Sequence, residues 1–365
     1  MKVTFPHMGT AWIPMRAILR DLDVEVVVPP PTTRRTVELG VRHSPEFACF
    51  PLKLNLGNFM EAYELGADTI LMGGGTGPCR FGYYAQVHRE ILADLGYDFR
   101  MVVLEPPRGH IGELLEKLRF ITGGQPLRRI WRALRLGWNK FQAIDTLERE
   151  VFRVRAREKI RGSASRTFQR GLEMIDEARN VEETWESVEK CLDLLARIPR
   201  DEDVEPLRVG VVGEIFMITE PAANLKVLER LGSMGVEVDR AVMIGEWIRQ
   251  HLLLDALRLR RKKDPVKEAA KPYLDHFVGG EGLESIGNSV LYARRGYDGI
   301  VHILPFTCMP EIVARSLLPQ VAADHDIPVL TLVLDEHAGE AGVLTRLEAF
   351  VDLLRRRKEQ RRSCC

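Results

Sequence analysis

The feature that most constrains the fold of this 365-residue chain is a repeated alternation of short β-rich runs with helix-length segments. In the first hundred residues the β-rich runs are residues 3–5, 25–28, 69–72 and 101–104, and after Pro206 they are residues 208–212, 238–244, 299–306 and 328–334, followed by a closing helix over 342–357. The intervening segments are long enough for the crossover helices that connect parallel strands. The pattern predicts an α/β protein with two Rossmann-like parallel-sheet domains.

Between the two α/β halves the strand pattern disappears. Apolar residues recur there at helical spacing, as in Ile130, Leu134 and Trp138. We therefore expect a helical insert between the two sheets. The predicted boundaries are 1–110 for the first α/β domain, 111–205 for the helical insert, and 206–365 for the second α/β domain with its C-terminal helix.

The charge of the insert is uneven. Residues 117–170 hold 15 Lys/Arg and 4 Asp/Glu, whereas residues 173–205 hold 4 Lys/Arg and 12 Asp/Glu. The basic part could bind anions, such as the phosphate groups of a ligand or an acidic surface of a partner protein. A solvated helix face without a partner is the alternative. The side chains whose charge reversal would distinguish the two are Arg128, Arg129, Arg132 and Arg135.

The overall composition excludes several classes of partner. Lys+Arg and Asp+Glu both number 52, so the average charge does not favour nucleic acid or a membrane surface. No apolar run of about 18 residues occurs, and the N-terminus has no basic and apolar segments typical of a signal peptide. We expect a cytoplasmic protein with neither nucleic acid nor membrane as a partner.

The six cysteines are too sparse for a disulfide framework and contain no CxxC pair. Cys191 shares a helical apolar face with Val188 and Leu195, which predicts a core position. Cys364 and Cys365 end a basic tail and are not expected to bind a ligand. Three cysteines remain for a site.

Those three cysteines, Cys49, Cys79 and Cys308, each lie within two residues of a proline, and two of them directly follow predicted strands. Proline keeps the backbone there out of regular helix or strand, so the thiolate is exposed on a loop and neighbouring backbone N–H groups can donate hydrogen bonds to its sulfur. Three thiolates from distant loops could hold a [4Fe-4S] cluster by three corners and leave one iron for an exogenous ligand. They could also hold zinc with a fourth ligand of another type. Three buried apolar cysteines are the alternative without a ligand.

Other turns that follow predicted strands indicate a functional site less strongly. The glycine run Gly73–Gly77 lacks GxxxxGK[ST], and Pro78 and Arg80 interrupt GxGxxG, so nucleotide binding is disfavoured. Carboxylates in Asp335–Gly342 and at Gly213-Glu214 could act as general acids or bases, or could cap helices. No catalytic residue is assigned from these patterns.

Five segments together resemble the 2-hydroxyacyl-CoA dehydratase / benzoyl-CoA reductase superfamily, and within it the branch related to acyl-CoA dehydratase activases. The segments are FACFPLK at 47–53, GTGPCRF at 75–81, Gly213-Glu214, GIVHILPFTCMP at 299–310 and DEHAGEAGVLTRLEAF at 335–350. The resemblance covers most of the two α/β halves and is weak in the helical insert.

The resemblance implies one [4Fe-4S] cluster held by three cysteines between two Rossmann-like domains, and the matching positions are Cys49, Cys79 and Cys308. In catalytic members a separate ATP-hydrolysing activator supplies a low-potential electron, which the cluster passes to a thioester carbonyl to give a ketyl radical. This chain has no actin-like phosphate motif and no P-loop, so the activator would be a partner. The resemblance also implies a homodimer or a related second subunit.

The expected function is therefore an iron-sulfur redox protein that reduces a small, acyl-CoA-like substrate or passes the electron on. One alternative is a non-catalytic cluster-bearing scaffold or regulatory subunit. Another is a structural zinc protein that uses the same three cysteines.

Overall fold

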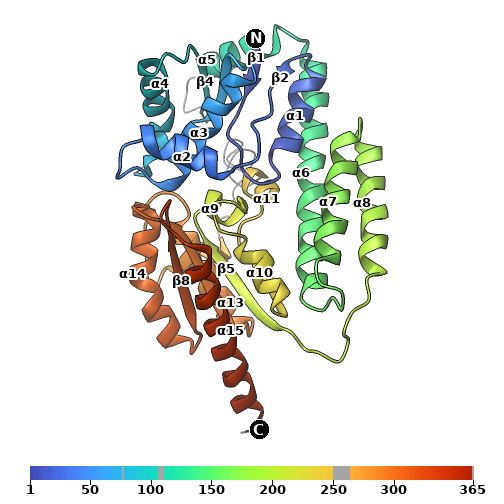
Figure 1. Cartoon of the computed structure of the whole chain (residues 1–365), viewed down its shortest axis with the longest axis vertical. Coiled ribbons are helices and arrows are strands. Elements are labelled where there is room, and N and C mark those ends of the chain that lie inside the picture. Colours follow the sequence, from blue (N-terminus) through green and yellow to red (C-terminus); the bar gives the residue numbers. More distant parts are fainter. Residues whose placement is uncertain (76–77, 106–110, 250–263, 364–365) are drawn as a thin grey trace. The chain divides into compact units, whose positions relative to one another are not determined.

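The computed structural model describes residues 1–75, 78–105, 111–249 and 264–363, and it contains two α/β units (Figure 1). Within these ranges, unit 1 comprises residues 1–144, 172–187 and 244–249. Unit 2 comprises residues 145–171, 188–243 and 264–363. The helical residues that separate the two sheets in the sequence are thus divided between the two units.

Unit 1 is built on a four-stranded parallel sheet with the order β2-β1-β3-β4. Its strands are β1 (Lys2–Thr4), β2 (Glu25–Val26), β3 (Thr69–Gly73) and β4 (Arg100–Leu104). Its helices around the sheet are α1 (Trp12–Asp21), α2 (Arg34–His43), α3 (Phe50–Glu64), η1 (Arg80–Tyr83), α4 (Tyr84–Asp94) and α5 (Ile111–Thr122).

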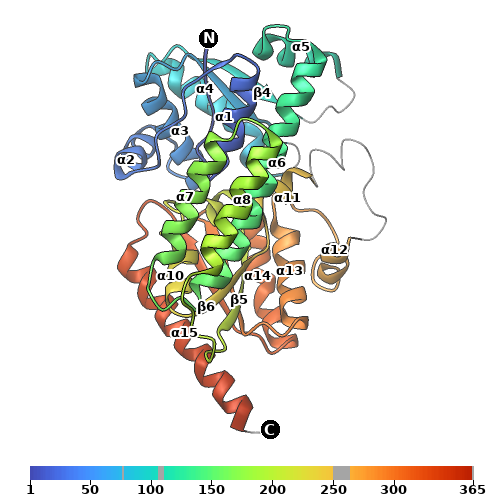
Figure 2. The same cartoon turned by 90° about the vertical axis from the view of Figure 1, so that its right-hand side faces the viewer.

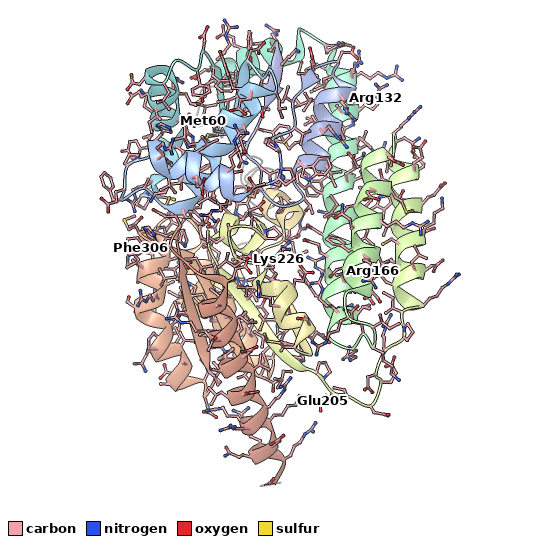
Figure 3. The ribbon with its side chains drawn as sticks, viewed as in Figure 1. Met60, Arg132, Arg166, Glu205, Lys226 and Phe306 are labelled. Carbon is pink, nitrogen blue, oxygen red and sulfur yellow. The ribbon has the colours of Figure 1, made fainter. Side chains whose placement is uncertain are left out.

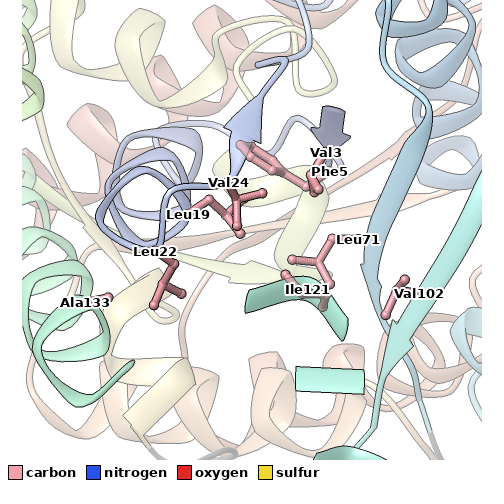
Figure 4. Close-up of a cluster of buried hydrophobic side chains, with 9 residues drawn as sticks. All are labelled: Val3, Phe5, Leu19, Leu22, Val24, Leu71, Val102, Ile121 and Ala133. Atoms are coloured by element: carbon pink, nitrogen blue, oxygen red, sulfur yellow. The ribbon is translucent and has the colours of Figure 1, made fainter. Parts of the chain in front are cut away.

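Alternating side chains of β3 enter two cores, one on each face of this sheet, because successive residues of a strand point to opposite sides. Leu71 belongs to the core drawn in Figure 4, which α1 also lines through Leu19. Ile70 and Met72 belong to the core formed with α3 and α4. Both faces of the sheet are therefore covered by helices, as in Rossmann-like folds.

Unit 2 repeats the architecture with a parallel sheet of order β6-β5-β7-β8. Its strands are β5 (Leu207–Gly213), β6 (Val236–Arg240), β7 (Gly299–Pro305) and β8 (Val329–Leu334). Its helices around the sheet are α9 (Ile215–Thr219), α10 (Val227–Ser233), α12 (Pro265–Ala270), α13 (Gly282–Arg294), α14 (Met309–Asp324) and α15 (Glu340–Ser363).

Three longer helices connect the two sheets in the sequence: α6 (Leu127–Arg155), α7 (Ser163–Glu177) and α8 (Val181–Ala196). They lie side by side (Figure 2). Trp185 of α8 donates a hydrogen bond of 2.9 Å from Nε1 to Asn139 of α6, and Cys191 of α8 contacts Thr167 of α7. The short helix α11 (Ile244–Ile248) packs against Ala11 and Phe141 in unit 1.

The predicted fold class is confirmed: the protein is α/β with two Rossmann-like parallel sheets. One strand was placed wrongly. Residues 238–244 were expected as a strand, but β6 is Val236–Arg240 and residues 244–248 form α11. The apolar run at 241–244 is compatible with a strand and with a helix. In β6, buried residues such as Val236 and Val238 alternate with more exposed ones, as is typical of an edge strand.

No helix in the described ranges is long and apolar enough to cross a lipid bilayer.

Candidate functional site

The three cysteines of the predicted site share one backbone setting. Cys49, Cys79 and Cys308 are the N-cap residues of α3, η1 and α14, with φ of -69°, -68° and -71° and extended ψ values. None of the three side chains caps its own helix. The partial positive charge at the N-terminus of an α-helix stabilises an anionic sulfur, so the positions of Cys49 before α3 and of Cys308 before α14 suit thiolates.

Unit 1 brings the loops of Cys49 and Cys79 together. Arg80, which follows Cys79, donates from Nη1 to the carbonyl oxygen of Phe47 at 3.2 Å. The Cys49 Sγ is hydrogen-bonded to the Oη of Tyr84, the first residue of α4 after η1. Because these contacts link the two loops, two of the three predicted ligands lie in neighbouring loops of one unit.

In the described part of the glycine run after β3, Gly75 packs closely against η1. A Cβ atom on Gly75 would lie 2.7 Å from Cδ1 of Phe81 and 3.1 Å from the backbone nitrogen of Gly82. The connection can therefore lie against η1 only with glycine at this position. Thr76 and Gly77 of the same motif lie outside the described residues.

Cys308 lies after β7 in unit 2 and is buried. The preceding Thr307 has φ of 67°, and the Cys308 N–H donates to the Pro305 carbonyl at 3.1 Å, so the turn into α14 is tight. In the first turn of α14, Glu311 lies 2.8 Å from Nε2 of His302 and accepts a hydrogen bond from Ser285. These buried contacts fix the start of α14 to β7 and α13.

Two further carboxyl groups lie at the carboxyl end of this sheet. Glu214 follows β5 and accepts hydrogen bonds from the N–H groups of Phe216 and Met217 at 3.1 and 2.9 Å. Burial raises the pKa of Glu214 to about 7, against the lowering effect of those hydrogen bonds, and the Glu311 carboxylate adds to the rise. Glu214 can therefore hold or release a proton near neutral pH.

Glu281, the N-cap residue of α13, is the second of these groups and is buried. Burial, together with repulsion from Glu214 and Glu311, raises the pKa of its carboxyl well above the ordinary value. The carboxyl accepts a hydrogen bond from the backbone of Ile215. Sequence analysis missed Glu281 and His302. The only indication for Glu281 is its place in a glycine-rich turn, Gly279–Gly282.

The raised pKa of Glu214 predicts how the stability of the metal-free protein depends on pH. Between pH 4.5 and a pH of about 7, the folded state binds more protons at Glu214 than the unfolded state does. The contribution of Glu214 to the free energy of unfolding therefore falls as pH rises. The loss amounts to at most about 3 kcal/mol. Urea unfolding of wild type and Glu214→Gln across this range should show a shallower decline in the variant, and parallel curves would contradict the assignment.

The acidic turn after β8 forms local contacts. The Asp335 carboxylate accepts a hydrogen bond from the His337 N–H at 2.9 Å, and Glu340 at the start of α15 pairs with Arg230 at 2.8 Å. The first contact is a turn within the segment and the second is an ion pair, and only Glu340, in the first turn of α15, has the place at a helix N-terminus that suits an acidic residue.

Large apolar side chains next to the cysteines are exposed in both units. Phe47 and Tyr83, two and four residues from Cys49 and Cys79 in the sequence, are each 70% exposed. Phe306, two residues before Cys308, is 56% exposed (Figure 3). Each of the three cysteines therefore has a large exposed apolar side chain within four residues of it in the sequence.

Two of the four arginines singled out on α6 form ion pairs within unit 1. Arg129 lies 2.6 Å from Asp23 and Arg132 lies 2.7 Å from Asp21. They therefore hold α6 against the end of α1.

Arg128 and Arg135 are exposed on a face of α6 that Arg132, four and three residues away from them, borders. They share that face with Trp131, which is 70% exposed, and with the exposed Leu127 and Leu134, because residues spaced by three or four lie on one side of a helix. This basic apolar face, defined by these five residues, could meet a partner.

The core position of Cys191 explains it without a ligand. Cys191 is fully buried in α8 as predicted, and burial raises the pKa of its thiol. Cys364 and Cys365 lie outside the described residues.

The thiols fit an iron-sulfur cluster by the chemistry of their donor atoms. No group of three or more metal-ligating side chains forms in the described part of the chain. Two of the predicted ligands belong to unit 1 and the third to unit 2, so neither unit contains the complete set.

Neither a family model nor a curated protein matches this sequence.

Proposed function

We propose that this chain is an iron-sulfur redox protein in which Cys49, Cys79 and Cys308 hold one [4Fe-4S] cluster by three corners. The observation that carries the proposal is their common backbone geometry: each is the residue directly before a helix, with φ near -70° and extended ψ. Thiolates are the usual protein ligands of such clusters.

The sheet topology supports the same assignment. In unit 1 the central strands are β1 and β3, and in unit 2 they are β5 and β7. Ligands of open α/β sheets bind beyond the carboxyl ends of the strands, where the strand order reverses. Cys79 follows β3 and Cys308 follows β7, so each has this position in its own unit.

When bound, the cluster supplies one-electron chemistry. We propose that it accepts low-potential electrons from an ATP-hydrolysing activator and either reduces a small acyl-CoA-like substrate or passes the electron on. The exposed Phe47, Tyr83 and Phe306 would shield the bound group from water. The carboxyl group of Glu214, with its pKa of about 7, is suited to exchange a proton during the reaction.

The test is turnover under anaerobic conditions. Reconstituted protein is mixed with reductant, an activator, ATP and either acyl-CoA thioesters or other small reducible molecules. Consumption of one of these compounds, dependent on ATP and iron, supports a catalytic role. An iron-loaded protein that oxidises the activator but turns over none of them is the cluster-bearing scaffold, and a colourless protein that binds zinc alone contradicts the proposal.

We propose that the basic apolar face of α6 meets an acidic surface of the activator. Leu127, Trp131 and Leu134 offer apolar contact, and Arg128 and Arg135 on the same face offer positive charge. The apolar groups favour a protein surface over the phosphates of CoA, because phosphates gain nothing from apolar contact.

Reversing both charges in Arg128→Glu/Arg135→Glu is expected to weaken activator binding at low salt by about tenfold or more and to flatten its salt dependence. The iron content and CoA binding should not change. Binding is measured by calorimetry at two ionic strengths.

The matched control is Arg129→Glu/Arg132→Glu, which breaks the ion pairs with Asp23 and Asp21. It should lower the free energy of unfolding by about 1 kcal/mol, and because Arg132 only borders the basic apolar face, it should weaken activator binding less than the Arg128/Arg135 variant does. Equal binding by the Arg128/Arg135 variant and wild type would show that this face has no partner.

A further inference from the structure

We infer that Tyr84 is a positioning residue of the proposed cluster: its hydroxyl donates a hydrogen bond to the sulfur of Cys49 and thereby raises the reduction potential of the cluster. This inference rests on the proposed function, and the contacts that carry it lie within unit 1 alone.

The hydrogen bond joins two segments that lie far apart in the sequence. Cys49 precedes α3, and Tyr84 is the first residue of α4. The Oη atom of Tyr84 and the Sγ atom of Cys49 are hydrogen-bond partners, and in the metal-free protein either of them can be the donor. A cysteine that binds iron has lost its proton and can only accept a hydrogen bond. On iron binding, the hydroxyl of Tyr84 therefore becomes the donor.

The ring of Tyr84 is held in place by its neighbours. Tyr84 is buried and belongs to the core formed by α3 and α4. The centroids of the Phe81 and His88 rings lie 5.2 and 5.8 Å from that of Tyr84. Both pairs meet edge to face, an arrangement that aromatic rings favour. The position of the hydroxyl is therefore fixed by ring packing and not by the hydrogen bond alone.

His88 also joins α4 to α3. It lies one turn after Tyr84 and is fully buried, and its Nε2 atom lies 3.0 Å from the carbonyl oxygen of Leu52 in the first turn of α3. Burial lowers the pKa of His88 to about 4, so the ring is neutral near pH 7. Because a carbonyl oxygen only accepts, Nε2 is the nitrogen that carries the proton. This contact fixes the start of α4 to the start of α3 without adding a charge.

The loop before Cys49 is anchored as well. Lys53 is buried and donates from Nζ to the carbonyl oxygen of Glu46 at 3.0 Å. Arg80 donates to the carbonyl oxygen of Phe47 at 3.2 Å. Both acceptors lie within the three residues before Cys49. The sulfur and the hydroxyl are therefore each held by other contacts, as is typical of outer residues that orient a metal ligand.

The direction of donation determines the electronic effect. A hydrogen bond to a ligand sulfur withdraws negative charge from the cluster and stabilises its reduced form, which carries one more electron. Loss of the hydroxyl should therefore lower the reduction potential. Hydrogen bonds to charged groups are strong enough to change the ratio of reduced to oxidised cluster by about tenfold, which corresponds to about 59 mV for a one-electron couple.

The experiment measures that ratio. Full-length protein is reconstituted anaerobically with ferrous iron and sulfide and is titrated with dithionite, which supplies the one electron that converts [4Fe-4S]²⁺ to [4Fe-4S]⁺. The reduced form is followed by EPR at potentials set with mediator dyes. Wild type is compared with Tyr84→Phe, which removes only the hydroxyl and keeps the ring. The matched control is Tyr83→Phe, which removes the hydroxyl of the exposed neighbouring residue. A fourth protein carries 3-fluorotyrosine at position 84, whose more acidic hydroxyl donates a stronger hydrogen bond.

At the midpoint potential of wild type, the ratio of reduced to oxidised cluster is expected to be about tenfold lower in Tyr84→Phe. It should be several-fold higher with 3-fluorotyrosine and unchanged in Tyr83→Phe. Shifts in opposite directions at one position would not arise from a loosened structure.

If all four proteins assemble the cluster and share one potential, Tyr84 does not act on the cluster, and the proposed function stands. If Tyr84→Phe assembles no cluster, the 3-fluorotyrosine protein decides, and an unshifted potential in it contradicts the role of Tyr84. If wild type assembles no cluster, the proposed function is wrong and the role of Tyr84 falls with it.

Discussion

Replacing any one of Cys49, Cys79 and Cys308 by serine is expected to remove most of the iron from anaerobically reconstituted protein. A serine oxygen is a poor substitute for thiolate at the iron of a cluster, and a cluster with two remaining sulfur ligands is not retained. Iron and acid-labile sulfide per chain give the measurement.

The matched controls are Cys191→Ser and a chain without residues 364–365. Cys191 is fully buried in α8, so its replacement places a hydroxyl in the core and should lower the free energy of unfolding by about 1–3 kcal/mol. Neither control should lose iron. Equal iron retention in all variants would contradict the ligand assignment.

Exposure to air is expected to bleach the cluster-loaded protein. A cluster with one corner not bound by thiolate loses that iron on oxidation and then degrades further. The brown absorbance and the iron content should fall together, whereas anaerobic protein keeps both.

The control for this oxidation is the same protein held in air with excess reductant, which should bleach more slowly. Four irons per chain and unchanged absorbance after hours in air would show that all four corners are protected, and the three-thiolate site would be wrong.

The fold was predictable because its central strands are buried on both faces. Strands β5 and β7 are mostly apolar, with Arg208 and His302 as the exceptions, and they end at glycine or proline, a pattern typical of parallel strands. The edge strand β6 was misplaced because its alternation is short and an apolar run follows it. Which helix faces are buried could not be predicted either, because Arg129 is distinguished from Arg128 by contacts with Asp21 and Asp23 at and after the end of α1.

The candidate site was predictable in part. The positions of Cys49, Cys79 and Cys308 next to prolines and strand ends singled them out, and the structure adds that all three are N-cap residues. Glu281 and His302 could not be found in this way. Their setting arises from tertiary contacts with Ile215 and Glu311, and within the sequence a glutamate before a helix predicts only a cap.

The central claim is that three cysteines hold one [4Fe-4S] cluster. The most direct measurement is anaerobic reconstitution of the full chain, followed by iron and sulfide analysis and EPR of the dithionite-reduced protein. The account predicts about four irons and four sulfides per chain and the EPR signal of a reduced [4Fe-4S]⁺ cluster. Protein that binds zinc, or no metal, and gives no such signal would contradict it.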